Sequence, residues 1–176
     1  MKQALLLIAI LIVVRATAQP LLPINTYLNN KQVSATAKEY YHGKFKASDD
    51  DRTFSIFDSL WTRNNATRPF YIFLTSRILE HADGALSEMA GSYCKGYIEQ
   101  HPDQLVTYLK SLNKTRREKE EDEWAMAISG EFAIDCDGNV LTCINKSHKI
   151  ALAKVSKQNK EILNELYVLI RHYASQ

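Results

Sequence analysis

Residues 81–102 read HADGALSEMAGSYCKGYIEQHP, and this stretch indicates the fold class. Its apolar residues recur at intervals of three and four, the period of one face of an α-helix, at Leu86, Met89, Ala90, Tyr93, Cys94, Tyr97 and Ile98. Asp83-Gly84 should end the preceding helix, with Gly84 in a left-handed conformation, and His101-Pro102 should end this one. The stretch therefore predicts a helix over about residues 85–100.

Gly91 and Gly96 fall inside this predicted helix. In a helix interior each glycine costs about 1 kcal/mol relative to alanine. The close approach of a neighbouring helix or of a bound ligand would account for their presence.

Other amphipathic segments lie on both sides of this helix. Helix starts are predicted near Arg52, Pro69, Ala85 and Asp103, about 17 residues apart, which is half of a typical two-helix repeat. The residue identities do not recur with that period, so a HEAT-like or tetratricopeptide array is only the minor alternative. We predict an all-α fold: one domain over residues 19–176, built of stacked antiparallel helix hairpins with about six helices.

Two segments depart from the helical pattern. Residues 19–30 are expected to be extended or poorly ordered. Residues 132–143, which surround Asp137-Gly138, fit either a small β-hairpin inserted in the helical domain or a plain loop between two helices. Asp135 to Asn139 also resembles the centre of a calcium loop, but both acidic ends of that motif are missing, so we predict a turn and no metal.

Residues 1–18 have the pattern of a secretion signal, with Lys2 near the start, the apolar run Ala4–Val14 and an A-x-A sequence before Gln19. The apolar run is shorter than the roughly 20 residues that a membrane-crossing helix needs. We expect cleavage before Gln19, export to the periplasm or the cell exterior, and no membrane span after cleavage.

The charge balance argues against nucleic-acid binding. The chain has 22 Lys and Arg and 20 Asp and Glu residues, and removal of Lys2 and Arg15 with the signal leaves 20 of each. A neutral chain without a basic stripe lacks the phosphate-neutralising surface that nucleic acids require.

The three cysteines are Cys94, Cys136 and Cys143. A disulfide between Cys136 and Cys143 would close a short loop and stabilise the fold by about 2.5 kcal/mol. Cys94 lies on the apolar face of its predicted helix, where burial should raise its pKa and make it unreactive.

Five reactive side chains in and beside the quoted stretch form the candidate functional cluster: Glu80, His81, Asp83, Glu88 and His101. The two histidines lie at the ends of successive predicted helices. Straight antiparallel helices would keep them about 20 Å apart, which argues against a shared metal. Most members of the cluster also have a structural explanation, as caps or as solvated first-turn residues.

Residues 116–123 read RREKEEDE, so every side chain is charged and both signs are present. They fit either an interaction tail or the solvated first turns of a helix that ends near Phe132. Interleaved pairs of opposite charge at a spacing of four favour the solvated helix face.

No catalytic signature, phosphate loop or dinucleotide-binding glycine motif occurs in the chain, and no cofactor is expected. We therefore predict an exported binding module without catalytic activity, with a protein or peptide partner. Aromatic candidates for partner contacts, each of which fits the core equally well, are Tyr40, Tyr41, Trp61, Tyr97 and Trp124. The alternatives are a small hydrolytic or metal-dependent enzyme that uses His81, Asp83 and Glu88, and a structural component of an envelope assembly.

Overall fold

Nine α-helices follow one another along residues 18–176, the part of the chain that the computed structural model describes. The helices are α1 Ile24–Leu28, α2 Ala35–Tyr41, α3 Asp51–Asp58, α4 Arg68–Leu79, α5 Gly84–Gln100, α6 Pro102–Lys110, α7 Lys114–Asp135, α8 Val140–Lys154 and α9 Lys160–Tyr173. Short 3-10 turns at Ser59–Trp61 and Lys157–Asn159 follow α3 and precede α9. The all-α prediction is confirmed for these residues, but the expected number of about six helices is too low, because short helices such as α1 and α2 give no long periodic pattern. The proposed secretion signal lies outside the described residues except for residue 18.

The predicted helix starts are accurate to within one residue for α3, α4, α5 and α6. Local signals explain this accuracy: side-chain caps at the starts of α3 and α5, and a proline in the first turn of α4 and of α6. The carboxylate of Asp50 accepts a hydrogen bond of 2.9 Å from the backbone N–H of Thr53, and Asp83 accepts one of 3.1 Å from Leu86. The interpretation of Gly84 is wrong, because this residue begins α5 and does not have a positive φ.

The hairpin alternative for residues 132–143 is wrong, and the loop alternative is confirmed. Helix α7 continues to Asp135 and α8 starts at Val140, which leaves a tight connection with Gly138 at φ +119°. A disulfide joins Cys136 to Cys143 across this connection, with their Cα atoms 6.3 Å apart. Cys94 is free and buried, and burial raises the pKa of its thiol.

The N-terminal segment 19–30 is not extended throughout, because residues Ile24–Leu28 form α1. Tyr27 of this helix is buried, and its ring stacks on that of Phe70 with centroids 5.2 Å apart. The Tyr27 hydroxyl also accepts a hydrogen bond of 2.9 Å from the backbone N–H of Leu22. One aromatic anchor therefore holds this segment against α4.

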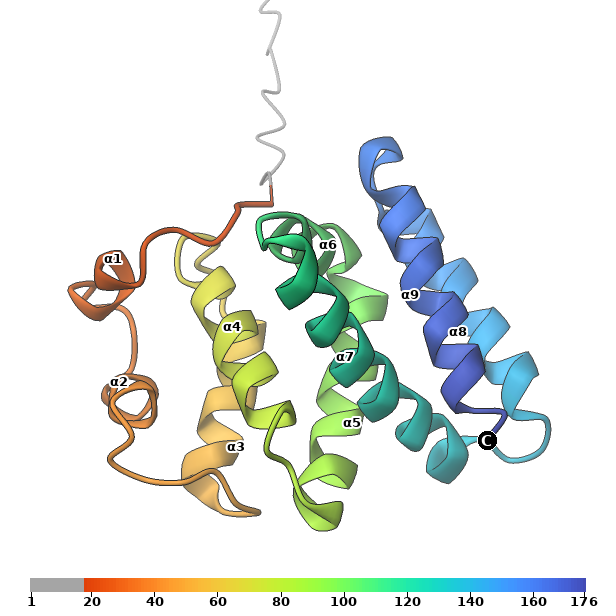
Figure 1. Cartoon of the computed structure of the whole chain (residues 1–176), viewed down its shortest axis with the longest axis horizontal. Coiled ribbons are helices and arrows are strands. Elements are labelled where there is room, and N and C mark those ends of the chain that lie inside the picture. The colour runs from red at the N-terminus through yellow and green to blue at the C-terminus, as the bar shows by residue number, and fades with distance from the viewer. Residues whose placement is uncertain (1–17) are drawn as a thin grey trace, which may run out of the picture.

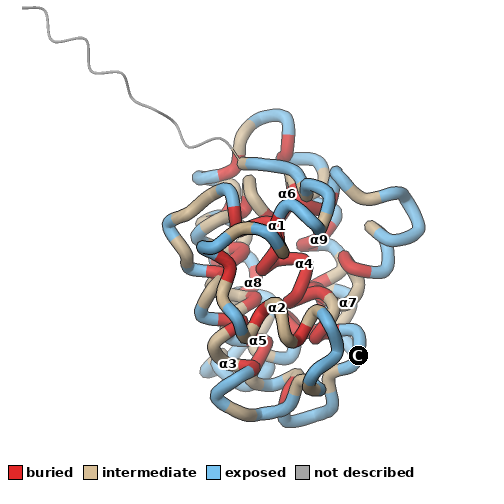
Figure 2. Tube along the Cα trace, turned by 90° about the vertical axis from the view of Figure 1, so that its left-hand side faces the viewer, coloured by how far each residue is buried: buried red, intermediate tan, exposed pale blue. Residues whose placement is uncertain are grey.

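Helix α7 is the centre of the domain and contacts α4, α5, α6, α8 and α9. Figure 1 shows α1 to α4 on one side of it and the pair α8 and α9 on the other. In Figure 2 the buried parts of the trace lie inside a shell of exposed segments. A single core is thus shared by all the long helices.

The two glycines of α5 are explained by close packing. A Cβ atom at Gly91 would lie 2.7 Å from the backbone oxygen of Ala127 in α7, and one at Gly96 would lie 3.3 Å from the indole ring of Trp61. A neighbouring helix therefore accounts for the first glycine and a tryptophan ring for the second.

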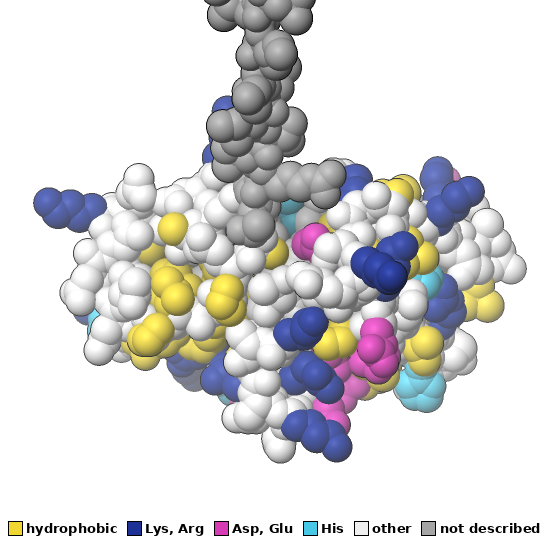
Figure 3. Space-filling model, turned by 90° about the horizontal axis from the view of Figure 1, so that it is seen from above, with side chains coloured by type: hydrophobic (Ala, Val, Ile, Leu, Met, Phe, Trp, Pro, Cys, Tyr) yellow, Lys and Arg dark blue, Asp and Glu magenta, His cyan; other side chains and the backbone are white. Residues whose placement is uncertain are grey.

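The surface mixes charges of both signs. Seen from above, hydrophobic side chains are most frequent towards the α1–α2 end, whereas Lys, Arg, Asp and Glu gather towards the α8–α9 end (Figure 3). Within residues 18–176 no helix combines the length and the apolar character that a membrane span requires.

Candidate binding cleft

The candidate cluster from the sequence is not brought together in the structure. Asp83 and His101 flank the two ends of α5, whose 17 residues span about 25 Å. His81 and Glu88 are exposed, and each lies near the Asp83 end of the helix. Among residues 18–176 no three His, Cys, Asp or Glu side chains are grouped closely enough to hold a metal ion.

His101 instead belongs to an aromatic cluster. Its ring lies 5.8 Å from that of Trp61 and 5.3 Å from that of Tyr97, measured between centroids. Burial lowers the pKa of His101, and the positive charges of Arg68 and Lys154 lower it further. A neutral histidine in this position packs against the aromatic rings.

The five candidate aromatics divide between core and surface. Trp124 and Tyr97 are completely buried, and Tyr40 is buried as well. Tyr41 is half-buried, and Trp61 is 39% exposed. Only Tyr41 and Trp61 are therefore placed to contact a partner directly.

A hollow of about 890 Å³ lies between the end of α2, the second half of α4 and the start of α7. We call it the α4–α7 cleft. It is lined by Tyr41, Phe73, Arg77, Glu80, Asn113, Lys114, Thr115, Arg116, Lys119, Glu120 and Glu123. Of the predicted site residues, only Glu80 and Tyr41 line this cleft.

Arg77 is the most informative residue of the cleft. Helix α4 buries eleven of its twelve residues, and Arg77 is the exception. Its guanidinium lies over the rings of Tyr40, Tyr41 and Phe73, at 5.8, 5.5 and 5.9 Å from their centroids. No carboxylate within residues 18–176 forms an ion pair with it. Its charge interacts with the aromatic faces and, through one long contact of 3.5 Å, with the backbone oxygen of Tyr41.

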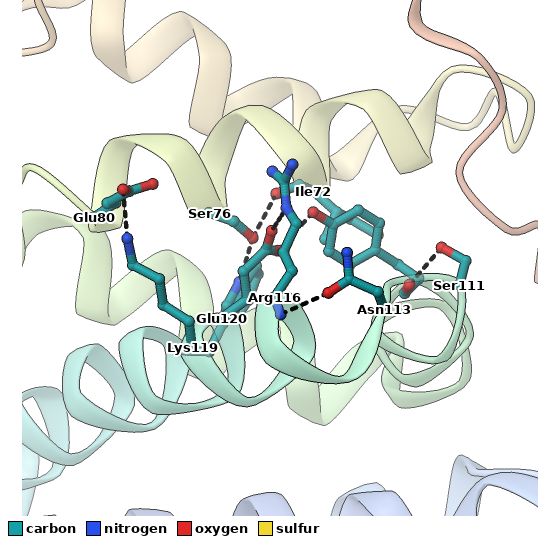
Figure 4. Close-up of polar contacts among 10 residues, drawn as sticks. Ile72, Ser76, Glu80, Ser111, Asn113, Arg116, Lys119 and Glu120 are labelled. Carbon is teal, nitrogen blue, oxygen red and sulfur yellow. Dashed lines mark hydrogen bonds and ion pairs between the residues drawn. The ribbon is translucent and has the colours of Figure 1, made fainter.

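Arg116 is held in the cleft by a buried carboxylate (Figure 4). Glu120, whose side chain is 7% exposed, accepts a hydrogen bond of 2.7 Å from Arg116 Nε and one of 2.6 Å from the Tyr108 hydroxyl. Burial, together with the negative charge of Glu120, raises the pKa of Tyr108, which therefore stays a donor. The same geometry places the Arg116 guanidinium 5.3 Å from the centroid of Phe73.

Lys119 and Glu80 form an ion pair across the cleft, from α7 to α4 (Figure 4). This pair lowers the pKa of Glu80, chiefly through the hydrogen bond from Lys119. Both side chains are substantially exposed, so the pair adds little stability but neutralises one carboxylate of the cleft.

The interpretation of residues 116–123 as a solvated face is wrong for two of them. Glu120 and Glu121 are each only 5% exposed. The sequence contained a signal for this burial, because Glu120 precedes Trp124 by four residues, and Glu121 precedes Ile128 by seven. Extending the apolar face of α7 back by one turn would have included both carboxylates.

Glu121 lies on the side of α7 that faces α9. Its Oε1 atom is 3.5 Å from Arg117 Nε, but neither atom has a hydrogen-bond partner. Burial raises the pKa of Glu121 to about 7; the charge of Arg117 opposes this shift, and Glu165, Glu118 and Asp122 add to it. The fold therefore favours the protonated form of this carboxyl group.

This shift predicts a pH-dependent stability. Because the folded-state pKa is raised, the stabilising contribution of protonated Glu121 is present below the unfolded pKa near 4.5 and is lost as pH rises through about 7. We expect Glu121→Gln to raise the free energy of unfolding by about 1–3 kcal/mol at pH 8 and to leave it nearly unchanged at pH 4.

Urea unfolding of the variant and the wild type at both pH values measures this difference. His101 and His148 have lowered pKa values and act in the opposite direction, so the comparison between the two proteins isolates Glu121. Parallel pH profiles of the two proteins would show that Glu121 does not titrate as described.

The α4–α7 cleft offers charged and aromatic contacts on two helices that pack against each other. Two guanidinium groups face one ring, and a buried hydrogen-bond network fixes one of them. No family model, no curated protein and no solved structure matches this chain. The chemistry of the cleft favours recognition of a partner through ion pairs and aromatic contacts.

Proposed function

We propose that this protein is an exported binding module that holds a protein or peptide partner in the α4–α7 cleft. The observation that carries the proposal is Arg77, a cation without a carboxylate partner in the described residues, which lies on aromatic faces in an open hollow. Arginine and tyrosine are the side chains most often responsible for binding energy at protein interfaces.

Two observations support the exported location. Residues 1–18 have the pattern of a secretion signal. The disulfide between Cys136 and Cys143 is of the kind that persists in oxidising compartments.

Site-specific photo-crosslinking in the source cells tests this function. A benzophenone amino acid at Lys114, which lines the cleft and whose side chain is 81% exposed, should give adducts of discrete mass with one partner. The matched control places the same group at Ile134, which is 64% exposed at the far end of α7.

We expect adducts at position 114 but not at position 134, and their loss when Arg77→Glu is added. Equal adducts at both positions, or none at position 114, would contradict a binding role for the cleft. Far-UV circular dichroism of each variant checks that the fold is retained.

A further inference from the structure

We infer that the partner presents an acidic segment, with a carboxylate bound by Arg77 and Arg116 over Phe73 and an adjoining apolar side chain against Tyr41. This inference rests on the proposed function of the α4–α7 cleft. It specifies the chemistry of the partner as an acidic peptide segment rather than a small anion or a polyanion.

The two guanidinium groups are neighbours. They lie 5.9 and 5.3 Å from the centroid of the Phe73 ring, so they are no more than about 11 Å apart. One short segment of a partner chain can therefore contact both groups at the same time.

Both arginines have unused hydrogen-bond donors. Arg116 donates its Nε–H to Glu120, and within residues 18–176 its two terminal nitrogens make no hydrogen bond. Arg77 makes one long contact of 3.5 Å, from Nη1 to the backbone oxygen of Tyr41. A guanidinium carries five N–H donors in a planar fork that matches a carboxylate, so each arginine retains an edge for bidentate pairing.

The charge count favours singly charged groups. The cleft is lined by four cations, Arg77, Lys114, Arg116 and Lys119, and by three carboxylates, Glu80, Glu120 and Glu123. Glu80 and Glu120 are paired with Lys119 and Arg116 within the protein, and Lys114 lies 3.7 Å from Glu118, outside the lining. Arg77 is then the lining cation without a carboxylate partner among residues 18–176, which suits an isolated carboxylate but does not neutralise a phosphate cluster or a nucleic acid.

The rings add an apolar component. Tyr41 is half-buried at the edge of the cleft, and it forms an aromatic cluster with Phe70 and Phe73, at 6.1 Å between centroids in each case. An apolar side chain next to the bound carboxylate would cover the exposed part of Tyr41. Acidic residues alternating with apolar ones fit both components of the cleft.

The test uses the mature chain and a fluorescein-labelled peptide of alternating glutamate and phenylalanine, with a glutamine–phenylalanine peptide as its uncharged counterpart. We expect the glutamate peptide to bind more tightly, and Arg77→Gln to weaken its binding tenfold or more, since hydrogen bonds to charged groups contribute about 1.5–3 kcal/mol. Arg77→Lys should restore only part of the affinity, because an ammonium cannot form the bidentate pair.

Arg63→Gln is the matched control. Arg63 is exposed in the loop before α4, where it forms no ion pair within residues 18–176, and its replacement removes the same net charge. Its affinity for the glutamate peptide should equal that of the wild type. An equal loss in the Arg63 and Arg77 variants would overturn the inference.

Two further outcomes are decisive. Equal binding of the glutamate and glutamine peptides, or displacement by inorganic phosphate at constant ionic strength, would also overturn the inference. If crosslinks still form at position 114, the cleft binds a partner of other chemistry and the proposed function stands. If neither peptide binds and no crosslink forms, both proposals fail.

Discussion

Replacing Gly91 by alanine is expected to lower the free energy of unfolding by about 2 kcal/mol, within the range for overpacked cores. The added Cβ would lie 2.7 Å from the backbone oxygen of Ala127 and 3.1 Å from the Cβ of Glu131. A backbone oxygen cannot rotate away, so α5 and α7 must separate along their contact. Gly91→Val should be worse, because its methyl groups extend further into α7.

Gly130→Ala is the matched control, since Gly130 also lies inside a long helix but has no atom within 4 Å of the added Cβ. There alanine should stabilise the protein by up to about 1 kcal/mol through its better helix propensity. Urea unfolding of the two variants should thus give changes of opposite sign. A stabilising Gly91→Ala would show that α5 and α7 do not approach as closely as described.

Periodicity and capping predicted the helices because these signals are local. The starts of α3 to α6 depend on residues within one turn, such as Asp50, which caps α3, and Pro102, which begins α6. For residues 132–143 the sequence does not decide between a hairpin and a loop, because a short apolar segment next to Asp-Gly suits a strand or a helix end equally well.

The cleft could not be predicted in the same way. Its walls come from the end of α2, from α4 and from the start of α7, segments that are brought together only by packing around α7. The stretch 81–102 is rich in reactive residues, but α5 lies between them. His81 and Asp83 precede this helix and His101 follows it, so about 25 Å of helix keeps the two ends of the stretch apart.

Burial of the charged residues also depends on tertiary contacts. Nothing in the sequence around Arg77 indicates a binding residue. Its position at a hollow becomes clear only from the structure, in which all the other residues of α4 are buried. Glu120 is buried because Tyr108 and Arg116 satisfy its oxygens, and the tyrosine comes from a different helix. Sequence can indicate the face of α7 that turns inward but not which partners meet it.

Trp124→Ala should lower the free energy of unfolding by about 3–5 kcal/mol, the usual cost of truncating a large buried aromatic side chain. Trp124 is completely buried, and its indole N–H donates a hydrogen bond of 2.9 Å to the hydroxyl of Ser76 in α4. Truncation would leave a cavity between α7 and α4, directly behind the cleft.

Trp61→Ala is the comparison that separates a core residue from a surface residue. Trp61 is 39% exposed and packs over Gly96, so its loss should cost about 1 kcal/mol and leave the fold intact. Urea unfolding followed by far-UV circular dichroism measures both variants without relying on tryptophan fluorescence. Similar small losses for the two variants would place Trp124 outside the core. A much larger loss of stability for Trp124→Ala than for Trp61→Ala would exclude Trp124 as a direct partner contact. A completely buried ring can influence binding only indirectly, through the position of α7 and of Arg116 on that helix.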